Sequence, residues 1–198
     1  MGNNERFIPD EELMQRLKAG EADCFRELVM RHQKGVINVA FRITGNHQDA
    51  EEIAQEVLFR IYKAAKDYRP ETKFSTYLYK ITLNLSFNQA RKAKAILKRF
   101  FSGEKSYHQK IEIGEVADKS YDTPMIAMER EEVKREVRKA IRSLPKRQRI
   151  AIILSQYQGF SYREISEIFD CSPKAVERLI HRGKIQLKKE LFPFLKKR

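Results

Sequence analysis

The C-terminal segment SYREISEIFDCSPKAVERLIHRGKIQLKK carries start signals for two helices separated by a tight turn. Ser161 and Glu164 have the spacing of a capping box, which begins a helix. Asp170 follows at the expected turn, and Asp accepts a left-handed backbone more easily than most residues. Ser172 is then a favourable N-cap, with Pro173 at the first helical position. These signals predict a helix-turn-helix motif.

The second of these helices separates into an apolar side and a charged side. In a helix-turn-helix, the exposed face of the second helix contacts the DNA major groove. Arg178 and Arg182 suit guanine edges, and His181 suits a base acceptor, while Lys174 and Lys184 suit phosphates. The apolar side contains Val176, Leu179, Ile180, Gly183 and Leu187, whereas the charged side contains Lys174, Glu177, Arg178, His181 and Arg182, flanked by Lys184.

A charged face that is simply solvated would produce the same pattern. From Ser172 to the end of the chain, however, there are nine Lys or Arg and only two acids, Glu177 and Glu190. Glu177 repels phosphate unless it accepts a hydrogen bond from a cytosine amino group. The whole chain has 40 Lys and Arg against 27 Asp and Glu, a formal net charge of +13. This excess predicts attraction to nucleic acid or an anionic membrane, and it favours DNA contact by the C-terminal motif.

Helical spacing of apolar residues recurs along the rest of the chain, and strand-like alternation is scarce, so we predict an all-α fold. We expect two small helical domains, residues 1–100 and 123–198, joined by a flexible linker at residues 101–122. The linker segment loses the helical periodicity and contains Gly and mixed charges. The predicted helices run from Cys24 to Ile43, from the N-cap Asn46 to a break at Tyr68, and from about Thr72 to Lys98, with later helices beginning at Pro124, Pro145, Ser161 and Ser172.

Several classes of protein are disfavoured by what the sequence lacks. No apolar run approaches the roughly 18 residues of a membrane span, and no signal-peptide pattern opens the chain. Cys24 and Cys171 stand far apart, without metal-ligand spacing. Glycine-rich phosphate loops and hydrolase motifs are missing as well. We therefore expect a cytoplasmic protein that is not an enzyme, has no cofactor or metal, and does not insert into membranes.

The third predicted helix carries a polar ridge opposite its apolar stripe. Its ridge residues are spaced by three or four and combine amides with cations, which suits base edges and phosphates. Nearby aromatic rings can stack on unpaired bases. An ordinary solvated helix face is the alternative, but the cation-rich end RKAKAILKR favours nucleic acid. The polar ridge consists of Thr76, Lys80, Asn84, Asn88 and Arg91, and the aromatic residues are Phe74, Tyr77 and Tyr79.

The second predicted helix is acidic within a strongly basic chain. Its segment DAEEIAQEVLF has four carboxylates and no cation. Asp49 and Glu52 lie in the first turns, where the helix dipole alone explains acidic residues. Gln55 and Glu56 lie beyond that effect, and with Phe59 they would suit docking of a basic protein helix. From physical reasoning alone, both explanations remain open.

Together, DAEEIAQEVLFRIY, KFSTYLYKITLNLSFNQARK and LPKRQRIAIILSQYQGFSYREISEIFDCSPKAVERLIHRGK resemble an extracytoplasmic-function sigma factor of the sigma-70 family. The resemblance extends from about Leu13 to Leu191. It implies that the first domain is sigma region two, which binds RNA polymerase core and recognises and melts the minus-ten element. The last domain would be region four, whose helix-turn-helix recognises the minus-thirty-five element. The loop from Tyr68 to Thr76 would hold a base flipped from the duplex.

The resemblance and the residue patterns described above together assign residues to each contact. Contact with the clamp coiled coil of the polymerase beta-prime subunit would involve Asp49, Glu52, Gln55, Glu56 and Phe59. Contact with the minus-ten element would involve Phe74, Thr76, Tyr77, Lys80, Asn84, Asn88 and Arg91. Contact with the minus-thirty-five element would involve Lys174, Glu177, Arg178, His181, Arg182 and Lys184. A separate anti-sigma factor, often bound at the inner membrane face, would control the protein.

This chain departs from the usual family pattern at several positions. Tyr77 stands where the family usually has Trp, and Asp170 replaces a usual Gly in the turn. Ala175 replaces a frequent Thr, and Glu177 stands where a cation is common. These departures predict an altered promoter preference.

Two other functions would explain part of the sequence. A stand-alone helix-turn-helix activator would account for the C-terminal motif but not for the acidic helix or the polar ridge. A non-specific single-strand nucleic-acid-binding protein would account for charge and aromatic residues but not for the capped helical hairpin. The sigma-factor interpretation accounts for all of these features.

Overall fold

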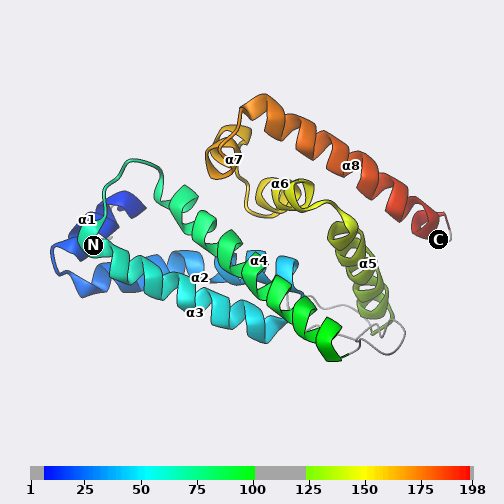
Figure 1. Ribbon diagram of the computed structural model, residues 1–198, viewed down its shortest axis with the longest axis horizontal. Coiled ribbons are helices and arrows are strands. Elements are labelled where there is room, and N and C mark those ends of the chain that lie inside the picture. The colour runs from blue at the N-terminus through cyan, green and yellow to red at the C-terminus, as the bar shows by residue number, and fades with distance from the viewer. Residues whose placement is uncertain (1–6, 101–123, 197–198) are drawn as a thin grey trace, which may run out of the picture. The chain divides into compact units, whose positions relative to one another are not determined.

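The computed structural model describes residues 7–100 and 124–196, with the side chains of residues 7–93 and 131–196. The described residues form helices joined by short loops, with no strand among them, which confirms the all-α prediction. The chain divides into two compact units, Met1–Ile111 and Glu112–Arg198 (Figure 1). The predicted linker, residues 101–122, lies outside the described residues, as does Thr123.

The N-terminal unit is a bundle in which α2 packs against α1, α3 and α4 (Figure 1). Gly45 ends α2 with a left-handed backbone at φ 79°. Asn46 then caps α3 by accepting a hydrogen bond from the Asp49 backbone N–H at 3.1 Å, as predicted. The elements are α1 (Asp10–Lys18), α2 (Ala22–Thr44), α3 (His47–Ala64), the short 3-10 helix η1 (Ala65–Asp67) and α4 (Phe74–Phe100).

Helix α1 was not predicted from the sequence. It buries Leu13, Met14 and Leu17 and packs against α2 and η1. Pro9 stands at its N-cap position, and three acids fill its first turn. Acidic residues in a first turn are a recognised start signal, so the information was present in the segment PDEEL.

The C-terminal unit is built around α8, against which α5, α6 and α7 all pack. Its core contains the aliphatic side chains Ile150, Ile153, Leu154, Ile165, Val176 and Ile180. The helices are α5 (Pro124–Ser143), α6 (Lys146–Tyr157), α7 (Tyr162–Phe169) and α8 (Pro173–Leu195), so each predicted start lies within one residue of the observed one.

Candidate DNA-binding surfaces

The turn between α7 and α8 forms as its sequence predicts. The Ser161 hydroxyl accepts from the Glu164 backbone N–H at 3.3 Å, and the Glu164 carboxylate accepts from the Ser161 N–H at 2.9 Å. Asp170 ends α7 with a left-handed backbone at φ 51°. Ser172 caps α8 by accepting from the Ala175 N–H at 3.3 Å. Each helix of the motif therefore begins with a side-chain cap formed by residues three positions apart, and Asp170 provides the turn between them.

Close packing on α6 orients α8. Val176 and Ile180 are buried, and Gly183 is buried too. A Cβ atom at Gly183 would lie 3.1 Å from the Ile152 Cγ1 atom of α6, so the absence of a side chain lets the two helices approach closely. With this side held in the core, the opposite side of α8 faces solvent.

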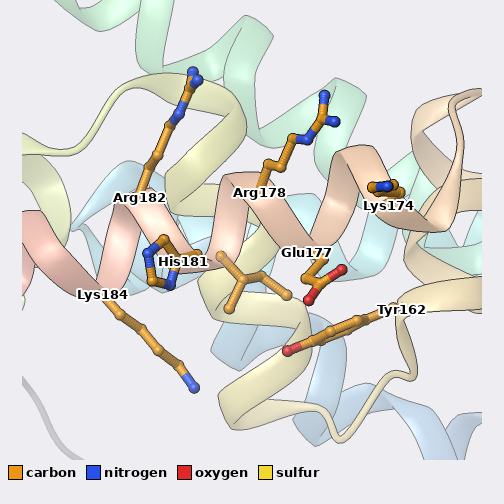
Figure 2. Close-up of a pocket in the computed structure, with 8 residues that line it drawn as sticks. Tyr162, Lys174, Glu177, Arg178, His181, Arg182 and Lys184 are labelled. Atoms are coloured by element: carbon orange, nitrogen blue, oxygen red, sulfur yellow. The ribbon is translucent and has the colours of Figure 1, made fainter.

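All six side chains predicted to contact the minus-thirty-five element are exposed. Figure 2 shows Arg178 and Arg182 extending to one side of α8, whereas Lys184 extends away from them and Glu177 lies beside Tyr162. Within the described part of the chain, none of the six makes an ion pair. Their charges therefore remain available to a partner.

Tyr162 is a residue of this surface that the sequence analysis missed. It is the first residue of α7 and lines the same hollow as Glu177, His181 and Lys184 (Figure 2). Its side chain is exposed. The capping box at Ser161 places Tyr162 at the start of α7, but only the packing of α7 on α8 brings it beside the second helix, so no local pattern indicated it.

The polar ridge of α4 is exposed over most of its length. Lys80, Asn84, Asn88 and Arg91 all face solvent, and Tyr77 is half-buried. The Arg91 guanidinium donates to the Asn88 side-chain oxygen at 2.8 Å. The exposed part of the polar ridge consists of Lys80, Asn84, Asn88 and Arg91.

Two of the residues assigned to minus-ten DNA are placed differently from the prediction. Thr76 was predicted on the exposed ridge, but its side chain is fully buried. It lies three residues before Tyr79 and seven before Leu83, which are also buried, so all three share one face of the helix. Phe74 is buried as well, with its ring 5.2 Å from that of His32. Neither side chain can stack on or bond to DNA in this structure.

Tyr79, suggested as a stacking residue, is also buried, with 5% of its surface exposed. Burial raises the pKa of Tyr79 to about 12. The ring therefore belongs to the core of the N-terminal unit. Tyr77 is the remaining aromatic residue of α4 near the ridge with partial access to solvent.

The predicted core-docking residues of α3 are mostly exposed. Glu52, Gln55, Glu56 and Phe59 face solvent. Glu56 pairs with Arg60 one turn later at 2.6 Å, and Lys63 Nζ lies 4.3 Å from the centre of the Phe59 ring.

Asp49, the remaining member of the docking set, is half-buried. Its carboxylate accepts from the Gln89 side chain of α4 at 2.9 Å. This bond gives Asp49 a structural role between two helices of the bundle, in addition to its place near the N-terminal dipole of α3.

No other kind of site stands out in the described residues. Within them, no helix is long and apolar enough to cross a membrane. In the same residues, no group of His, Cys, Asp or Glu side chains has the arrangement of a metal site. Cys24 and Cys171 are free thiols.

The described residues form two helical units, the second of which contains a helix-turn-helix, and comparisons with known proteins identify the class of protein. Residues 28–96 match the family described as Sigma-70 region 2, and residues 134–187 match Sigma-70, region 4. The sigma factor SigW of Bacillus subtilis is 31% identical over 180 residues, covering 90% of this chain and 94% of SigW. This chain therefore belongs to the extracytoplasmic-function sigma factors of the sigma-70 family.

Solved structures support the fold. CnrH, solved in complex with the cytosolic domain of CnrY, aligns with a TM-score of 0.69 at 22% identity, over 93% of this chain and 97% of that chain. The sigma factor RpoE of Bartonella quintana, solved with the anti-sigma factor NepR, aligns with a TM-score of 0.65 at 20% identity, over 84% of this chain and 96% of that chain. A family made of transcription initiation factors disfavours both the stand-alone activator and the non-specific single-strand binder.

Proposed function

We propose that this chain binds RNA polymerase core and selects promoters through two separate surfaces, α8 for the minus-thirty-five element and α4 for the minus-ten element. The observation that carries the proposal is the exposed charged face of α8, which lies opposite a buried face anchored by Val176, Ile180 and Gly183. A recognition helix in the major groove requires this division.

On α8, the chemistry of the exposed side chains assigns them different parts of recognition. Arg178 and Arg182 suit guanine, whose N7 and O6 atoms accept two hydrogen bonds from a guanidinium. Glu177 suits the amino group of cytosine, and His181 suits a base acceptor. Lys174 and Lys184 suit phosphates, which fix the register of the helix without reading sequence.

On α4, the polar ridge and Tyr77 are proposed to bind the minus-ten element. Amides such as Asn84 and Asn88 can bond base edges, and Lys80 and Arg91 can bind the backbone of an opened strand. The exposed loop at residues 69–73, just before α4, is proposed to hold the unpaired base.

Core docking is proposed for the exposed acidic face of α3, which would meet the clamp coiled coil of the beta-prime subunit. Gln55, Glu56 and Phe59 place an amide, a charge and an exposed ring together within about one turn, which suits the centre of an interface. We also propose control by an anti-sigma factor that covers the DNA-binding surfaces. The RpoE structure, which contains an anti-sigma factor, supports this by analogy of fold.

Run-off transcription with purified core polymerase tests the proposal. Core alone and core with this chain are compared on a library of genomic fragments. The proposal predicts transcripts with defined start sites only when the chain is added, because sigma subunits supply promoter specificity. Specific binding of the free chain to duplex DNA with no promoter-dependent transcript would contradict the proposal and favour an activator.

Core docking has its own test. We expect Gln55→Ala with Glu56→Ala to weaken core binding by about 10- to 100-fold, as expected for residues at the centre of an interface. The matched control is Glu12→Ala, which removes an exposed carboxylate from α1. Fluorescence anisotropy of labelled chain with core reports the affinity, and an unchanged value for the double variant would refute the α3 surface.

A further inference from the structure

The loop at residues 69–73 is held at both ends by side chains of α1. At one end, Lys18 Nζ donates to the backbone carbonyl of Tyr68 at 3.3 Å. At the other end, the Glu11 carboxylate accepts from the backbone N–H of Phe74 at 2.8 Å. All five residues between these two bonds are exposed. The loop is therefore exposed, and α1 fixes the separation of its two ends.

Helix α4 needs the bond from Glu11, because the sequence before it has no suitable cap at the N-cap position. The first intrahelical bond runs from the Tyr77 N–H to the Lys73 carbonyl, which places Lys73 at the N-cap. A Lys side chain has no acceptor atom and cannot satisfy the free N–H groups of a first turn. A carboxylate there satisfies a donor and complements the positive end of the helix dipole. Glu11 supplies both effects, although it lies 63 positions before Phe74 in the chain.

Helix α1 is itself fixed to α2 near the same place. The Asp10 carboxylate lies 2.9 Å from Arg31 Nη1 and 2.7 Å from His32 Nε2. Partial burial opposes ionisation of Asp10, but the bonds and charges of His32 and Arg31 outweigh it and lower its pKa. The His32 ring also contacts Phe74. At the start of α4, α1 therefore holds the Phe74 backbone through Glu11, and α2 contacts the Phe74 ring through His32.

We propose that α1 is the positioning element of the minus-ten loop, with Glu11 and Lys18 holding the two ends of the loop in the form that receives an unpaired base. The inference rests on the minus-ten recognition proposed above. A loop whose ends are fixed before binding loses less conformational freedom when a base enters it. Glu11 and Lys18 act through the loop backbone, so they are positioning residues and need not touch DNA.

The test uses holoenzyme assembled from core polymerase and the full chain. The probes are a single-stranded oligonucleotide with the non-template minus-ten sequence of a promoter found by run-off transcription, and a duplex that ends upstream of that element. We expect Glu11→Ala to weaken binding of the single strand by about tenfold, the scale of a lost helix cap. Binding of the upstream duplex and of core is expected to stay unchanged.

Three further variants separate positioning from general stability. Glu11→Gln keeps an acceptor oxygen without the charge and is expected to restore part of the lost affinity. Glu12→Ala, which removes an exposed carboxylate from the same turn, is expected to bind as wild type. Lys18→Met keeps the length of the side chain but removes the donor at the other end of the loop. Lys18→Met is expected to weaken single-strand binding about threefold. If Glu11→Ala fails to fold, Lys18→Met alone tests whether α1 positions the loop.

The outcomes are distinct. Wild-type affinity for the single strand in both Glu11→Ala and Lys18→Met would overturn the inference. Equal losses on single strand, duplex and core would also overturn it, because they would show general destabilisation. If wild-type holoenzyme itself ignores the single strand, the proposed minus-ten recognition fails and this inference fails with it.

Discussion

Helices α4 and α8 each present polar and cationic side chains to solvent, but different forces determine which residues those are. α8 begins with its own cap, Ser172, and packs through one side that contains Val176 and Ile180. α4 begins at Phe74 with a cap supplied by Glu11 of α1, and packs against both α2 and α3. The exposed face of α8 therefore follows from its own sequence, whereas that of α4 depends on its neighbours.

The contrast has a consequence for DNA recognition. All six predicted contacts on α8 are exposed, whereas Phe74 and Thr76 at the start of α4 are buried. The accessible polar surface of α4 thus begins near Tyr77 and Lys80, and the exposed loop before the helix becomes the candidate for holding a base. Substitutions at the six predicted contacts of α8 are therefore expected to change DNA binding, whereas substitutions at Phe74 or Thr76 of α4 are expected to change packing.

The largest effect is expected from Ile180→Ala, which removes a buried side chain from the packed side of α8. Such truncations cost about 2–5 kcal/mol of unfolding free energy. Minus-thirty-five duplex binding should fall with the folded fraction of the C-terminal unit. Urea denaturation followed by circular dichroism measures the loss, and Leu78→Ala in α4 is the counterpart in the N-terminal unit. A loss below about 1 kcal/mol would contradict the packing of α8.

An alkaline titration distinguishes α4 from α8, because α4 buries Tyr79 and α8 contains no Tyr. Burial raises the pKa of Tyr79 to about 12, while an unfolded Tyr titrates near pH 10. The unfolded state therefore loses its proton first, so this contribution is intact below about pH 10 and is lost between about pH 10 and pH 12. The difference corresponds to about 2–3 kcal/mol.

Urea unfolding of wild type and Tyr79→Phe at about pH 9 and about pH 11 checks this expectation. The variant lacks the ionisable phenol, so its stability should decline less over that interval. An equal decline in both proteins would show that Tyr79 does not titrate as its burial requires.

The next largest effect is expected from Arg178→Ala, which tests base recognition by α8 without changing the side of the helix that packs in the core. We expect a cost of about 1–3 kcal/mol at one base position, with relaxed discrimination there. Lys174→Ala is the matched control on the same face. Removing a phosphate contact should weaken binding to all DNA sequences alike, and it should reduce by about 1 the slope of the logarithm of the binding constant against the logarithm of salt concentration. Binding to a set of single-base promoter variants measures both. A uniform loss for Arg178→Ala would mean that it contacts backbone only.

The smallest effect is expected from Thr76→Val in α4. The Thr76 hydroxyl is buried and has no hydrogen-bond partner among the described residues. Replacing an unsatisfied hydroxyl by a methyl group of similar shape should raise the unfolding free energy by up to about 1 kcal/mol. Promoter binding should not change, whereas Asn84→Ala should weaken the minus-ten contact. A loss of minus-ten binding in Thr76→Val would contradict this account and would show that Thr76 takes part in DNA recognition.

The difference between the helices also explains which features could be predicted from the sequence alone and which could not. The caps at Asn46, Ser161 and Ser172 formed as predicted, because each depends on residues within three positions of one another. Thr76 was misplaced because it borders the ridge on a helical projection, and only the packing against neighbouring helices decides on which side of that border it falls. Tyr162 and Glu11 were missed because their neighbours are distant in sequence.

Transcription from a promoter library, in which every position of both elements is randomised, tests the central claim most directly. Holoenzyme containing wild-type chain, Asn84→Ala or Arg178→Ala would be compared by sequencing the transcripts. We predict that Arg178→Ala changes base preference only within the minus-thirty-five element and that Asn84→Ala changes it only within the minus-ten element. Changes by both variants at the same positions, or by neither at any position, would contradict two separate DNA-reading surfaces.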